Sequence, residues 1–192
     1  MDDYKPTPEE LKKAMMERFI LVPTLDIDYP KGVREYWQTI YDSGLLKLRM
    51  ADRENPTLEN VERMLKERST LKFTTYDLKE KRFCADCLLN NIRGLSAFAH
   101  FSVHPAYKGM LGVNIARAGA EQIFTLTDTK TNRTIDTLIG STPVTNKLAI
   151  KFIKKVGYKE KCILTNTYFL ASTGTITDSL ITQLRKGEVL WE

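Results

Sequence analysis

The hydrophobic pattern of this chain changes near Ser69, and this change is the strongest constraint on its fold. Before Ser69 the apolar residues recur every three or four positions, which is typical of amphipathic helices. Thr7 and Thr57 are suitable N-caps, and Pro8 suits the first position of a helix. We predict helices over residues 7–18, 30–44 and from 57 onward, and a short buried strand over residues 19–22.

After Ser69 the pattern becomes that of strands interrupted by two helices. We predict strands over 71–76, 82–90, 95–103, 134–140, 162–170 and 176–184, and helices over 110–124 and 146–156. The apolar face predicted for the second helix comprises Leu148, Ala149, Phe152, Ile153 and Val156. Early helices followed by such a sheet predict an α/β (α+β) fold with a mixed, mostly antiparallel central sheet flanked by helices.

The chain has 192 residues, a length that fits a single domain over residues 1–192 with its own core. Within it we expect a helical extension over 1–16, a strand plus two helices over 17–70, and a core sheet over 71–192. No apolar run approaches the roughly 18 residues that a membrane span needs, so no membrane partner is expected. Three cysteines are too few for a disulfide scaffold, which favours a reducing, cytoplasmic location.

The positive charge is concentrated in one segment. The net charge is +5, and residues 147–161, with six lysines and one glutamate, carry all of it. A general nucleic-acid binder spreads basic residues over a broad surface, so nucleic acid is not expected as a main partner. A single basic element better suits a compact polyanion, although a solvated lysine face is the commoner case.

Four residues match the spacing of a two-Cys, two-His zinc finger: Cys84, Cys87, His100 and His104. In a finger the two histidines lie on a helix, whereas residues 95–104 alternate like a strand and end at Pro105. Residues four apart on a strand are separated by about 13 Å, too far to share one zinc ion. We therefore predict no metal site and interpret Cys84 and Cys87 as small strand residues.

Two segments together indicate a function. The first is a strand followed by a glycine-containing loop and a helix, over residues 104–113, an arrangement that presents free backbone N–H groups to a phosphate. The second is a helix that begins at Asn146 and ends in Lys155-x-Gly157-Tyr158. The pair resembles the GNAT superfamily of N-acyltransferases, as does the order of the predicted elements over residues 17–190.

The resemblance implies a GNAT-like fold and binding of acetyl-coenzyme A or another acyl-coenzyme A. It assigns cofactor binding to six residues: Val103, Lys108, Gly109, Gly112, Val113 and Asn146. In the family a backbone N–H on the strand before the loop, here near Val103, polarises the thioester carbonyl. A basic side chain with a suitable ordinary pKa lies near that strand at His100, whose alternative interpretation is a sheet residue with no role.

The sequence also departs from the family pattern at two places. The loop Lys108-Gly109-Met110-Leu111-Gly112 lacks the second glycine in register, and Ile153 stands where many members carry a tyrosine that protonates the leaving thiolate. Catalytic residues therefore stay unassigned. Two hypotheses follow: an N-acyltransferase, or a non-catalytic GNAT-fold protein of a phage virion or head, with other virion proteins as partners.

The C-terminal segment bears on the second hypothesis. Residues 174–178, followed by Leu184 and Arg185, resemble a hairpin of phage-encoded GNAT-like proteins. That resemblance would place the protein in a host cytoplasm or a virion. The sequence leaves homo-oligomerisation and the acyl acceptor open.

Overall fold

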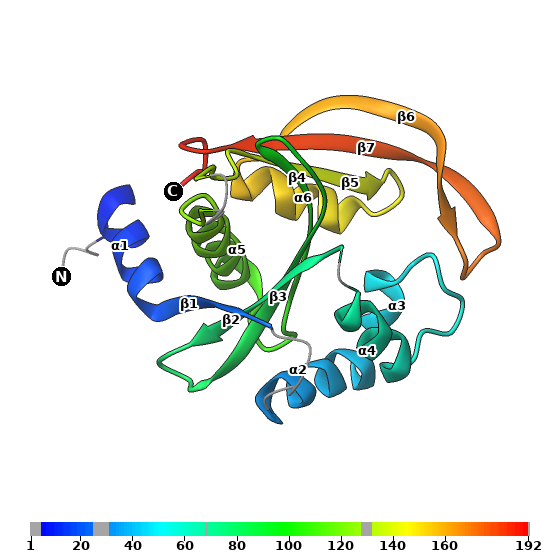
Figure 1. Cartoon of the computed structure of the whole chain (residues 1–192), viewed down its shortest axis with the longest axis horizontal. Coiled ribbons are helices and arrows are strands. Elements are labelled where there is room, and N and C mark those ends of the chain that lie inside the picture. The colour runs from blue at the N-terminus through cyan, green and yellow to red at the C-terminus, as the bar shows by residue number, and fades with distance from the viewer. Residues whose placement is uncertain (1–4, 25–30, 68, 128–131, 192) are drawn as a thin grey trace.

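A computed structural model describes residues 5–24, 31–67, 69–127 and 132–191. Its centre is a seven-stranded sheet in the order β1-β2-β3-β4-β5-β7-β6 (Figure 1). The strands are β1 (Phe19–Pro23), β2 (Leu71–Asp77), β3 (Arg82–Arg93), β4 (Ser96–Val103), β5 (Thr137–Pro143), β6 (Lys159–Leu170) and β7 (Thr175–Arg185). All neighbouring pairs are antiparallel except β4 and β5, which are parallel. The predicted mixed, mostly antiparallel sheet is confirmed.

Six helices accompany the sheet in the described ranges: α1 (Pro8–Arg18), α2 (Lys31–Asp42), α3 (Leu46–Arg49), α4 (Leu58–Lys66), α5 (Gly109–Ile123) and α6 (Lys147–Val156). The predicted helix starts are correct where they can be compared. Thr7 and Thr57 each form a capping box with the residue three positions later, and the Asn146 side chain caps α6. The predicted start of α2, Pro30, lies outside the described residues.

The helices cover both faces of the sheet, and β3 shows this division. Leu88 packs into a cluster with residues of α2, α3 and α4, whereas Cys87 and Leu89 pack into a cluster with α5. Successive residues of a strand point to opposite faces, so Leu88 and its two neighbours belong to different layers. The sheet is therefore held between α2–α4 on one side and α5–α6 on the other.

The C-terminal strands form a long curved hairpin whose tip reaches toward the segment after α3 (Figure 1). At that tip the N–H of Ala171 donates a hydrogen bond to the carbonyl of Ala51 at 2.9 Å. This contact joins the β6–β7 hairpin to the α2–α4 layer. In the described residues no helix is both long and apolar enough to cross a membrane.

Several details differ from the sequence prediction. The strand over 19–22, expected to be buried, is fully buried only at Phe19, whereas Ile20 and Val22 are 41% and 36% exposed because β1 lies at the edge of the sheet. Strand β6 begins at Lys159 rather than at residue 162. The strand expected over 134–140 begins at Thr137, because Thr134 forms an isolated bridge with Thr127 instead. The four-residue helix α3 was not predicted. Leu148, placed on the apolar face of α6, is 82% exposed because it lies at the margin of that face rather than at its centre.

Candidate functional site

The parallel strands β4 and β5 separate along their length. They pair from Ser96 to Phe98 on β4 and from Thr137 to Ile139 on β5, but no pairing continues beyond, although β4 runs to Val103 and β5 to Pro143. Over the same stretch β4 remains paired with β3 on its other edge. The second half of β4 therefore presents its free backbone edge to an opening in the sheet.

A cavity of about 330 Å³ occupies this opening. It is lined from both faces of the sheet, by Ile40 and Leu45 on the α2–α3 side and by Ala116 and Ala120 of α5 on the other. Across it the rings of Phe101 on β4 and Phe152 on α6 stack, with centroids 6.4 Å apart. The cavity thus extends through the opening in the sheet, and apolar side chains line much of its wall.

The N-terminus of α5 follows directly after β4. Lys108 is the N-cap residue and makes no side-chain hydrogen bond to the helix. Gly109 adopts the left-handed conformation, with φ of +62°, and a Cβ there would meet nothing within 4 Å. A Cβ on Gly112 would lie 2.7 Å from the Tyr107 carbonyl oxygen, so this turn packs too closely for any other residue. The exposed first turn of α5 is suited to an anion.

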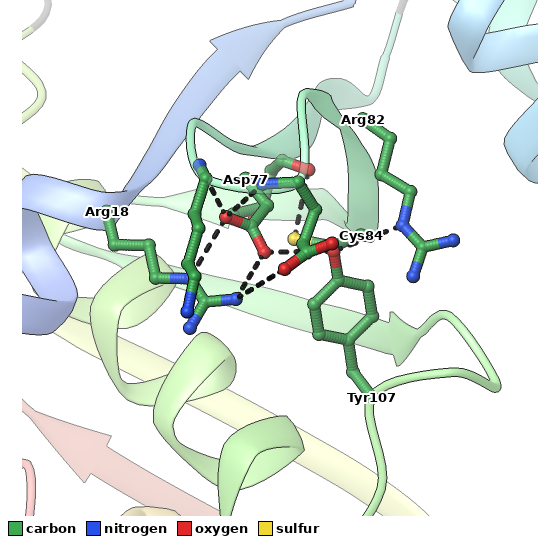
Figure 2. Close-up of polar contacts among 8 residues, drawn as sticks. Arg18, Asp77, Arg82, Cys84 and Tyr107 are labelled. Atoms are coloured by element: carbon green, nitrogen blue, oxygen red, sulfur yellow. Dashed lines mark hydrogen bonds and ion pairs between the residues drawn. The ribbon is translucent and has the colours of Figure 1, made fainter.

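Tyr107 fixes the loop before α5 to the rest of the sheet (Figure 2). Its hydroxyl donates a hydrogen bond to the Asp77 carboxylate at 2.9 Å, and Arg18 donates two more to the same carboxylate, at 3.0 and 2.8 Å. Burial raises the pKa of Asp77, but the hydrogen bonds from Arg18 and Tyr107 outweigh it, and the net pKa is lowered. Asp77 is therefore a charged anchor for the loop.

The six residues assigned to the cofactor occupy different places. Val103 and Asn146 line the cavity, from β4 and from the start of α6. Lys108 and Gly109 are exposed at the start of α5, and Gly112 is buried one turn on. The Val113 side chain is 3% exposed and belongs to the apolar core cluster of α5, away from the cavity wall.

Two bulky residues interrupt the glycines of this loop, and they take different positions. The Leu111 side chain packs against the apolar cluster that contains Phe19 and Tyr107. Met110 is 43% exposed. Leu111 thus points toward the core beside α1 and β1, and Met110 is the bulky side chain left at the surface of the turn.

His100 lies on β4 and lines the cavity. Burial, followed by the positive charge of Arg49, lowers its pKa from 6.5 to about 4. The ring is therefore neutral at pH 7, and its low pKa makes it a weak acceptor of a proton from an ammonium group. The ordinary pKa that made His100 a candidate base in the sequence does not hold in this position.

The position of the missing acid, Ile153, is on the cavity wall and is only half-buried. Two tyrosines that the sequence did not single out as replacements line the same cavity, Tyr158 after α6 and Tyr168 on β6. Burial raises the pKa of both hydroxyls, so they stay protonated at neutral pH. Tyr168 was not foreseen because a bulge between Leu164 and Tyr168 resets which side chains of β6 face inward.

The four residues with zinc-finger spacing do not form one cluster. His100 belongs to strand β4, as predicted, and lines the cavity, while His104 follows the strand and packs beside Tyr36 and Tyr107. Burial raises the pKa of the Cys84 and Cys87 thiols to about 12. Over the described ranges no group of three or more His, Cys, Asp or Glu residues is placed to hold a metal ion.

Comparison with known proteins identifies the fold. No protein family model matches the sequence, and no curated protein sequence matches it. Among solved structures, the ribosomal-protein-S5-alanine acetyltransferase of Vibrio fischeri is similar over 91% of this chain and 96% of its own, with a TM-score of 0.63 and 13% identity.

Two further acetyltransferases give comparable matches. The Salmonella typhimurium acetyltransferase that modifies the N-terminal serine of ribosomal protein L7/L12 aligns with a TM-score of 0.67 at 8% identity, over 88% of this chain and 95% of its own. Spermidine N-acetyltransferase of Vibrio cholerae, solved with CoA and spermine, aligns with a TM-score of 0.66 at 13% identity, over 90% and 98%. The chain thus has the fold of GNAT acetyltransferases, and the predicted fold class is confirmed.

Proposed function

We propose that this protein is an acyl-coenzyme A-dependent N-acyltransferase whose site is the opening between β4 and β5. The observation that carries the proposal is the opening beside the free edge of β4, which is lined by Val103 and Asn146. The chain continues from Val103 into the turn that leads to the uncapped N-terminus of α5. The spermidine N-acetyltransferase with the same fold was solved with CoA bound. The acetyl group is the acyl group we expect, because the similar structures are acetyltransferases.

The residues of the cavity wall and of the start of α5 fit such a ligand. Lys108 and the backbone of Gly109 and Gly112 would hold the pyrophosphate at the start of α5, where the helix dipole favours negative charge. The free edge of β4 near Val103 would face the thioester carbonyl, and Asn146 completes this set from the other side of the opening. Val113 would contribute through its backbone, since its side chain lies in the core.

Bound acyl-coenzyme A supplies the acyl group as a thioester. In the transfer the nitrogen of a neutral amine forms a bond to the acyl carbon and the carbon–sulfur bond breaks, so the products are an amide and a thiol. An ammonium group must first lose a proton, and the departing sulfur must gain one. The protonated hydroxyls of Tyr158 and Tyr168 are proton donors in the cavity. The low pKa of His100 makes it too weak a base for the ammonium proton, so no side chain is assigned that role.

Direct titration of coenzyme A into the protein tests the cofactor assignment. We expect saturable binding and a rise in melting temperature at about 1 mM coenzyme A, because a ligand that binds only the folded state stabilises it. Lys108→Glu reverses the exposed charge at the start of α5 and should weaken binding about tenfold. Lys186→Glu reverses an exposed charge after β7 and should leave binding unchanged.

The absence of both binding and thermal stabilisation would refute the proposal. The fold would then serve a non-catalytic role, as in the virion hypothesis from the sequence. A cytoplasmic location and a phage origin rest on the sequence prediction alone.

A further inference from the structure

The cavity wall has a distinctive charge pattern. In the part of the chain that the structure describes, Arg49 is the lining residue that is charged at neutral pH, and no aspartate or glutamate lines the cavity. His100 is neutral there. An acceptor with several ammonium groups would therefore bring positive charge to a wall that offers it no carboxylate.

The carboxylate that is bonded to Arg49 is fully engaged. Asp86, whose side chain is 3% exposed, accepts hydrogen bonds from the hydroxyl of Tyr36 at 2.9 Å and from the hydroxyl of Ser102. Its other oxygen accepts a hydrogen bond from Arg49 Nη2 at 2.7 Å. Asp86 thus holds Arg49 in place, and both of its oxygens are used within the protein.

The Arg49 side chain keeps an unused donor. Its side chain is 10% exposed, and its Nη2 also lies 3.4 Å from the carbonyl oxygen of His100. Its Nε is buried and has no hydrogen-bond partner among the described residues. A buried donor without an acceptor is costly, so Asp86 and the His100 carbonyl leave part of the guanidinium unsatisfied. A ligand oxygen can reach the part of the Arg49 side chain that lines the cavity.

We infer that the acyl acceptor is an amine that carries a carboxylate, bound by Arg49, and not a polyamine. The inference rests on the proposed acyl transfer and names its acceptor class. The guanidinium binds carboxylates through charge-assisted hydrogen bonds, and the apolar wall formed by Leu45, Leu48 and Phe101 suits an apolar body between the two polar ends.

Matched pairs of amines test the inference. We would compare L-phenylalanine with phenethylamine, L-leucine with isoamylamine, and both pairs with spermidine. Two readouts are used: thermal stabilisation of the wild-type protein by each amine alone, and thiol release with acetyl-coenzyme A. In both pairs the carboxylate-bearing partner should give stabilisation and a kcat/KM at least about tenfold higher, as a charge-assisted hydrogen bond implies.

A variant pair assigns the effect to Arg49. Arg49→Lys keeps a cation beside Asp86 but removes Nε and the planar guanidinium, and should abolish the preference for carboxylate-bearing amines. Arg63→Lys, an exposed change on α4, should preserve it.

The possible results distinguish failure of the acceptor class from failure of the proposed acyl transfer. Equal or better stabilisation by phenethylamine, isoamylamine or spermidine would overturn the acceptor class, as would no stabilisation by either amino acid. If coenzyme A binds and spermidine is acylated faster than the amino acids, the proposed function stands and this inference fails. If coenzyme A does not bind, the proposed function fails, and the stabilisation readout still decides whether the cavity selects a carboxylate.

Discussion

Lowering the pH from 6.5 to 4 should destabilise the protein through His100. The pKa of this ring is about 4 in the folded state, because burial and the charge of Arg49 oppose protonation, against an ordinary value of 6.5. Between these two values the unfolded chain binds a proton that the folded chain does not. Stability therefore falls as the pH falls across this window, and it is fully present above the unfolded pKa.

The size of this loss of stability follows from the difference between the folded and unfolded pKa values of His100. Each unit of pKa difference corresponds to about 1.4 kcal/mol, so His100 accounts for a loss of up to about 3 kcal/mol on reaching pH 4. His104 adds to the loss in the same direction, because burial, and then Arg82, also lower its pKa. Asp77 acts at lower pH, since its pKa is lowered below 3.8.

Urea denaturation at intervals from pH 7 to pH 4.5 measures this dependence. The wild-type free energy of unfolding should decline steadily, and His100→Gln, which cannot take up a proton, should show a flatter profile. His104→Gln is the matched control and should remove a smaller part of the slope. A wild-type profile without slope between pH 6.5 and 4.5, or a His100→Gln profile parallel to the wild type, would refute the reasoning.

Two substitutions test the loop and the missing acid. Tyr107→Phe removes the hydroxyl that donates to the buried Asp77 carboxylate and should cost about 1.5–3 kcal/mol of unfolding free energy. The control Tyr41→Phe, at an exposed position, should cost nothing measurable. An equal loss in both variants would contradict the role of Asp77 as an anchor for the loop. Ile153→Tyr places a hydroxyl on the cavity wall, should cost less than about 1 kcal/mol, and should raise kcat for thiol release. Ile115→Tyr, in the core on α5 and away from the cavity wall, should cost about 1–3 kcal/mol, and equal costs at the two positions would show that the cavity has no room.

Local signals in the sequence predicted most of the fold. The caps at Thr7, Thr57 and Asn146 determine where three helices begin, because each side chain satisfies a backbone N–H that the helix leaves free. The strand pattern of residues 95–103 was also sufficient to place His100 on β4 rather than on a finger helix. These features depend on residues close together in the chain.

The site was less predictable, because it depends on contacts between distant segments. Arg49 lies on a helix of four residues, too short to show a hydrophobic period, and its importance comes from Asp86 on β3. Ile153 was expected in the core, but the separation of β4 from β5 leaves it on a cavity wall, and helical periodicity carries no information about that separation. The pKa of His100 depends in the same way on the elements packed around it.

Detection of an acylated product tests the central claim most directly. Purified protein would be incubated with acetyl-coenzyme A and the amines named above, with thiol release followed in parallel and the products identified by mass spectrometry. The account predicts amide products that gain one acetyl group, formed in step with thiol release and reduced in Lys108→Glu. No product from any of these amines, in a protein that also fails to bind coenzyme A, would contradict it.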